Sequence, residues 1–231
     1  MTDTHPGLSP YLYCLGNPVR YIDPNGMDEY GVNTQGEVIL LRKTNDEKDL
    51  LIAGAYLNKK GEVKGLKYDK EGNLSNKTIE VSKGVFTERS INHKVLNGLG
   101  HLYMFTDKEE AHKVFQFMAN NTQVEWGLYN KKIGSSSETF YLTTSHLMDR
   151  EIISASMMNY EIRENVVSYH CHSHPGGSYG DYGHINDTEN SSPSISDINF
   201  AKDIQAIAIE KSMIIPSFFI YSRGKYYEYT P

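Results

Sequence analysis

Apolar residues in the second half of the chain follow a helical period at two places. In TDKEEAHKVFQFMANNT they recur at i, i+3, i+4 and i+7, with Thr106 or Asp107 as the N-cap of the predicted helix. The residues on this face are Ala111, Val114, Phe115 and Met118. A second amphipathic helix is predicted for SISDINFAKDIQAIAIEKS, near the end of the chain.

Strand-like runs lie between and after these helices. VEWGLYNK and ETFYLTTSHL come first, and VVSYHCHSHP follows with alternate residues facing the same side. IIPSFFIYSRGKYYEYT closes the sequence as a hairpin around Arg223 and Gly224. We therefore expect an α/β domain with a mixed central sheet flanked by helices.

Residues 30–90 differ from the rest of the chain. Short β-prone runs are separated there by Asn-x-x-Gly, Lys-Lys-Gly and Glu-Gly-Asn turns, which predicts the hairpins of an exposed antiparallel sheet. A linking sheet and a substrate-docking surface are both compatible with this polar region. We expect three parts: 1–27, a β-rich linker or accessory region at 28–105, and the α/β domain at 106–231.

Composition excludes several functional classes. The chain has 231 residues, a formal charge of −6 and a pI of about 5.8, so no basic surface suggests a nucleic-acid partner. No apolar run approaches the roughly 20 residues that cross a bilayer, and no signal peptide is visible. The two cysteines, Cys14 and Cys171, are far apart, so any metal must rely on histidine and carboxylate. Cys171 is expected to be a small buried residue.

The candidate metal-binding residues are concentrated in one segment at 170–197, HCHSHPGGSYGDYGHINDTENSSPSISD. His172 and His174 are two residues apart on an extended segment, so they point the same way and suit zinc. Asp197 is the third candidate ligand, held on a first helical turn by a capping-box spacing from Ser194. Each part also has a structural interpretation, as an ordinary His-x-His pair or an ordinary helix cap. His170 is expected in the core or at its rim, and His184 is expected to be exposed to solvent.

Together these residues resemble the JAMM motif of the JAB/MPN metallopeptidases, Glu…His-x-His-Pro-x7-Ser-x-x-Asp. HSHP matches the first block, Ser194 and Asp197 match the second, and the similarity covers about 105–231. The resemblance implies a cytidine-deaminase-like JAB/MPN fold. One departure is the spacer 176–193, which has 18 residues where the family has seven. Such a loop beside the metal could act as a lid or a substrate-selecting rim.

The glutamate of this motif is expected upstream of the histidines. Glu125, in VEWGLYN, matches the family's E-x-x-GLL-x-G strand and shares a strand face with Gly127. Four other glutamates fit the chain order less well: Glu138, Glu151, Glu161 and Glu164.

The resemblance implies a zinc-dependent peptidase. His172, His174 and Asp197 would hold Zn2+, which lowers the pKa of a bound water to ~7. Glu125 would be the general base, and Ser194 would stabilise the oxyanion. Family members cleave peptide or isopeptide bonds, often at ubiquitin or a ubiquitin-like tail, so a protein or peptide substrate is expected.

The N-terminal segment suggests how such an enzyme would be carried. SPYLYCLGNPVRYIDPNGM, at about 9–27, resembles the end of the core of RHS (rearrangement hot spot) proteins, although it also suits a plain turn. In that family a shell of repeats encloses a C-terminal toxin, and the chain is cut just after DPxG. The resemblance implies a polymorphic toxin exported into a target cell, with an upstream RHS shell and an immunity protein in the producing cell.

Two other functions remain as alternatives. The first is a catalytically inactive MPN-like binding module, against which the intact set of five motif residues argues. The second is a non-haem iron oxygenase, because two histidines and one carboxylate form its metal site. The Ser-x-x-Asp placement and the glutamate-bearing strand argue against the oxygenase.

Overall fold

The computed structural model describes most of the chain after residue 26. The described ranges are 27–44, 46–95, 98–132, 137–148, 151–162, 166–174 and 192–231. The RHS-like segment, Glu164, His184 and nearly all of the 176–193 spacer lie outside the described residues. The structure therefore does not test the predictions made for these residues.

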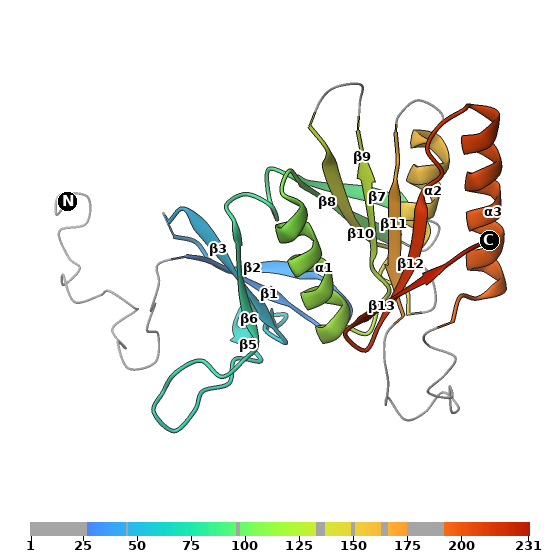
Figure 1. The fold of residues 1–231 in the computed structure, drawn as a ribbon. Coiled ribbons are helices and arrows are strands. Elements are labelled where there is room, and N and C mark those ends of the chain that lie inside the picture. The colour runs from blue at the N-terminus through green and yellow to red at the C-terminus, as the bar shows by residue number, and fades with distance from the viewer. Residues whose placement is uncertain are drawn as a thin grey trace.

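The main sheet of the described chain has seven strands in the order β13-β12-β11-β9-β10-β8-β7 (Figure 1). Their bounds are β7 (Ser90–Val95), β8 (Gly98–Phe105), β9 (Gly127–Lys131), β10 (Thr139–Thr144), β11 (Tyr169–Ser173), β12 (Ser217–Ser222) and β13 (Lys225–Tyr229). β11 and β12 are parallel, and the other neighbours are antiparallel. The predicted mixed sheet is thus observed, with the predicted C-terminal hairpin at its edge.

Three helices accompany the sheet in the described residues: α1 (Lys108–Asn121), α2 (Ile152–Glu161) and α3 (Ile195–Glu210). Of the two predicted N-caps for α1, Asp107 is the one used, and its side chain accepts the backbone N–H of Glu110. α2 was not expected from the pattern. Its N-cap is Glu151, which is not a usual capping residue, and IISASMMNYE lacks a clear apolar stripe.

The N-terminal region forms a second sheet in the order β2-β1-β3-β6 and a small hairpin. Its strands are β1 (Asp28–Val32), β2 (Val38–Arg42), β3 (Lys48–Ala53) and β6 (Thr78–Ser82), and the hairpin pairs β4 (Tyr56–Leu57) with β5 (Val63–Lys64). β1 and β3 run parallel, so this sheet is mixed and the expected purely antiparallel arrangement is wrong. Sequence-adjacent hairpins were the only pairings that the local turn signals could predict.

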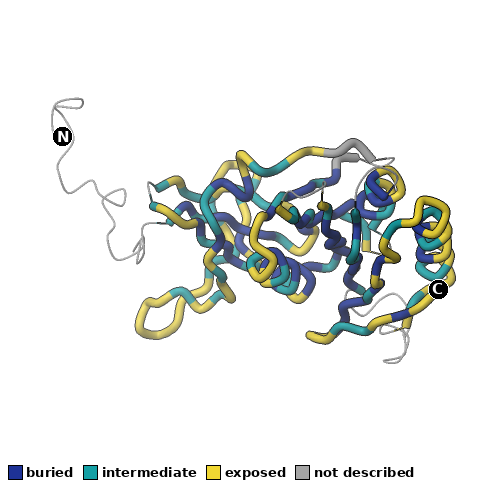
Figure 2. Tube along the Cα trace, turned by 45° about the horizontal axis from the view of Figure 1, so that its top comes forward, coloured by how far each residue is buried: buried dark blue, intermediate teal, exposed yellow. Residues whose placement is uncertain are grey.

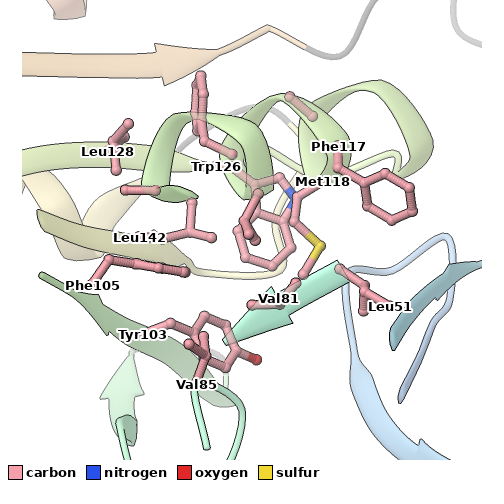
Figure 3. Close-up of a cluster of buried hydrophobic side chains, with 14 of the residues drawn as sticks. Leu51, Val81, Val85, Tyr103, Phe105, Phe117, Met118, Trp126, Leu128 and Leu142 are labelled. Carbon is pink, nitrogen blue, oxygen red and sulfur yellow. The ribbon is translucent and has the colours of Figure 1, made fainter. Parts of the chain in front are cut away.

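One hydrophobic core joins the two sheets through α1. Leu51 and Val81 of the N-terminal sheet meet Met118 of α1 and Trp126 of the main domain in one buried cluster (Figure 3). Buried residues gather in the centre of the molecule (Figure 2). The expectation of an exposed N-terminal sheet is therefore wrong, because its apolar face covers α1.

The opposite face of the main sheet carries α2 and α3. A second cluster fills this layer, with Met158 of α2 and Ile204 of α3 against Phe218 and Ile220 of β12. Cys171 of β11 points into the α1 layer and is fully buried, as predicted. Because strand side chains alternate, the histidines of β11 face the α2 and α3 layer.

Candidate metal centre

Three candidate ligands converge at the end of β11. His172 Nε2 lies 3.0 Å from His174 Nε2 and 3.3 Å from Asp197 Oδ1. His174 Nε2 lies 3.8 Å from Asp197 Oδ2. Within the described residues, these three form the one His, Cys, Asp or Glu group arranged closely enough to hold a metal ion.

The main sheet positions both histidines. β11 lies between β9 and β12, where His172 is paired with Gly127 on one side and with Ile220 on the other. His174 follows the strand, and its N–H donates to the carbonyl of Tyr221 at 3.0 Å. Strand pairing on both sides therefore orients His172, and the backbone bond to Tyr221 of β12 ties His174 to the same sheet.

The capping box of α3 positions the carboxylate. The Asp197 N–H donates to Ser194 Oγ at 3.2 Å, and the Ser194 N–H donates to Asp197 Oδ2 at 2.7 Å. Burial alone would raise the pKa of Asp197, but hydrogen bonding and charge from His172, with support from Ser194, hold that pKa below its ordinary value. The carboxylate is therefore ionised and aimed at the two imidazoles.

The donor set fits a divalent transition metal. Tetrahedral zinc with bonds of about 2.0–2.1 Å requires ligand atoms about 3.3 Å apart, and the three observed separations bracket this value. The side chains of His174 and Asp197 are 16% and 19% exposed, so the group is not fully buried. Catalytic zinc sites use three protein ligands and leave one position open.

Glu125 is not part of this group. Val124 and Trp126 point into the core around α1, so the side chain of Glu125 points to the opposite face, which Gly127 shares with His172. Its N–H donates to the Leu147 carbonyl at 2.8 Å, and it is 8% exposed. The placement is compatible with a general base, and that role stays a prediction.

The rival glutamates that the structure describes are used elsewhere. Glu138 accepts a hydrogen bond from Asn130, and Glu161 pairs with Lys131 at 2.7 Å. Glu151 caps α2 by accepting the N–H groups of Ile153 and Ser154.

The sequence pattern did not predict that α2 packs against the sheet beside His170. His170 is 3% exposed, its Nε2 lies 3.0 Å from Ser154 Oγ, and burial lowers its pKa to about 3, so it is the neutral core histidine that was expected. A Cβ on Gly127 would lie 2.5 Å from Ser154 Oγ, so only glycine lets α2 approach the sheet here. A glycine inside a strand was the available signal for this close approach.

The fold and site thus define a mixed α/β domain with a partly open His₂Asp metal-ligand group. Residues 103–202 match the family model described as JAB-like toxin 1, which supports a JAB-like toxin domain in this part of the chain. The match includes all five predicted motif residues and covers less than half of the sequence. No curated protein and no solved structure matches the chain. Among the described residues, no helix is long and apolar enough to cross a membrane.

Proposed function

We propose that this protein is a toxin whose C-terminal domain is a zinc-dependent peptidase or isopeptidase. The observation that carries the proposal is the convergence of His172, His174 and Asp197 in a geometry suited to a tetrahedral metal. The match to a JAB-like toxin family over the same residues supports a toxin and a hydrolase fold.

Each motif residue has a separate task in this proposal. The two imidazoles and Asp197 would hold zinc, which supplies Lewis-acid activation of water and of the scissile carbonyl. Glu125 takes a proton from the attacking water and delivers it to the leaving amine. The Ser194 hydroxyl accepts the Asp197 N–H as a helix cap, which leaves its own proton available for the developing oxyanion.

Delivery and partners form the wider part of the proposal. A toxin family suggests action inside a target cell. The RHS-like sequence of residues 9–27 supports carriage by an upstream RHS shell. We propose a protein or peptide substrate, including ubiquitin-like conjugates, and an immunity protein that protects the producing cell.

Metal content tests the proposal first. We expect about one zinc per purified chain by mass spectrometry, lost in His174→Ala and in Asp197→Ala because each removes a ligand. Zinc-loaded protein is then assayed on peptide and isopeptide substrates, with Glu125→Ala as the inactive, metal-replete control. Absence of zinc from the wild type, even after incubation with zinc, would leave an inactive binding module. Bound iron with an oxygen requirement would instead indicate an oxygenase.

A further inference from the structure

The N-terminal region builds the same five-residue turn three times within the described residues. The copies are 33–37 (NTQGE), 58–62 (NKKGE) and 69–73 (DKEGN). In each, the first side chain accepts the N–H of the fifth residue, at 2.9, 3.0 and 2.7 Å. The fourth residue is a glycine with φ of 76°, 75° and 86°, in the left-handed region. The three turns are therefore locally equivalent.

The three turns differ in what surrounds their glycines within the described residues. A Cβ at Gly61 or at Gly72 would meet nothing within 4 Å. A Cβ at Gly36 would lie 2.7 Å from Val124 Cγ2 and 3.1 Å from the Trp126 ring. The buried Gly36 is thus pressed against the two residues that flank Glu125.

Hydrogen bonds hold the first turn on both sides of this contact. The Gln123 N–H donates to the Thr34 carbonyl at 2.7 Å. His146 Nδ1 donates to the Gln35 carbonyl at 2.7 Å, since a carbonyl can only accept. The next residue, Leu147, accepts the Glu125 N–H. Gln123, two residues before Glu125, and His146, next to the residue that accepts the Glu125 N–H, are therefore both bonded to the 33–37 turn.

A histidine pair extends this connection into the main sheet. His146 Nε2 lies 2.7 Å from His101 Nδ1 of β8, so the other ring nitrogen of His146 forms a hydrogen bond with the main sheet. His146 also has a φ of 56°, which non-glycine residues adopt mainly where surrounding contacts impose it. The loop that carries Leu147 is thus bonded to β8 through His101 and to the 33–37 turn through Gln35.

We propose that the 33–37 turn is a positioning element for Glu125, which makes the N-terminal sheet part of the catalytic unit rather than a linker. The inference rests on the proposed role of Glu125 as general base. The turn does not contact substrate in this proposal; it acts through the 123–126 segment and through His146. A small displacement of a catalytic base can reduce turnover strongly.

The matched variants are Gly36→Ala and Gly61→Ala, which place the same side chain at nearly the same φ in the same turn. Only Gly36→Ala meets Val124. In hydrogen-exchange mass spectrometry, we expect the 123–126 amides to exchange at least about tenfold faster in Gly36→Ala, and within about twofold of wild type in Gly61→Ala. Exchange in α3 should be unchanged in both, which separates local loosening from global destabilisation.

Two further readouts follow the same segment. Trp126 is the single tryptophan of the chain, so its emission should shift to longer wavelength only in Gly36→Ala. On an isopeptide substrate, kcat should fall about tenfold in Gly36→Ala with zinc content and KM unchanged. Gly61→Ala should keep the wild-type kcat.

His146 provides a second test if Gly36→Ala does not fold. His146→Asn retains an N–H near the Nδ1 position and tolerates positive φ, whereas His146→Ala loses the donor. We expect His146→Ala to reproduce the faster exchange at 123–126 and His146→Asn to restore most of the protection. Equal exchange at 123–126 in Gly36→Ala and Gly61→Ala, or in both His146 variants and wild type, would overturn the positioning role. If the wild-type protein cleaves no substrate, the proposed peptidase function is wrong. The exchange comparison still shows whether the 33–37 turn holds the 123–126 segment in place.

Discussion

The two carboxylate oxygens of Asp197 have different partners. Oδ2 accepts the Ser194 N–H in the capping box, and Oδ1 faces His172. The helix-capping side chain is thus also a candidate metal ligand. The two interpretations of Ser-x-x-Asp drawn from the sequence are compatible, since one carboxylate has enough acceptor sites for both.

Asp197→Asn separates these two roles. The amide oxygen can still accept the Ser194 N–H, so the free energy of unfolding of the metal-free protein should change by less than about 1 kcal/mol. Zinc affinity should fall at least ~100-fold, because the anionic ligand is lost. Competition with a chromophoric chelator measures the affinity. Asp203→Asn removes an equal charge from an exposed position of α3 and should bind zinc like wild type.

At the scale of elements, α2 depends on the absence of a side chain in β9. Ser154 and Glu151 occupy the space that a Cβ at Gly127 would need, directly beside the pair formed with His172. The capped end of α2 can therefore approach the sheet this closely only because position 127 is a glycine.

Gly127→Ala should displace this end of α2 and lower the free energy of unfolding by about 1–3 kcal/mol, the usual cost of overpacking. Adding Ser154→Gly removes the nearest clashing atoms and should recover part of that loss. Urea unfolding of the two single variants and the double variant gives the coupling energy. Strictly additive effects would contradict the direct contact between the two positions.

The elements predicted from the sequence are those with strong local signals. α1, α3 and the hairpin at Arg223 follow from caps, apolar spacing and a turn, all within a few residues. α2 lacked a normal cap, and the parallel pairing of β1 with β3 joins segments whose contact no local pattern specifies. The site divides in the same way. His-x-His and Ser-x-x-Asp are local motifs, whereas Ser154 beside His170 and the turn beside Glu125 exist only after tertiary packing.

At the scale of the whole molecule, α1 makes the two sheets interdependent. Its apolar residues contact the N-terminal sheet as well as the main sheet, and one continuous core results. Unfolding of the N-terminal sheet would therefore expose apolar residues of α1 and of the shared core.

We therefore expect one cooperative unfolding transition for the described chain. Trp126 fluorescence, which reports on the shared core, and far-UV circular dichroism should give coincident urea curves. Separate midpoints for the two signals would show that the N-terminal sheet unfolds on its own.

The position of β11 in the sheet affects when the candidate metal centre can form during synthesis. β11 carries His172 but pairs with β12, which is encoded after α3. A ribosome that stops before Ser217 leaves β11 as an unpaired edge and His174 without its backbone partner. The candidate ligands His172, His174 and Asp197 can therefore converge only after β12 has been made and has paired with β11.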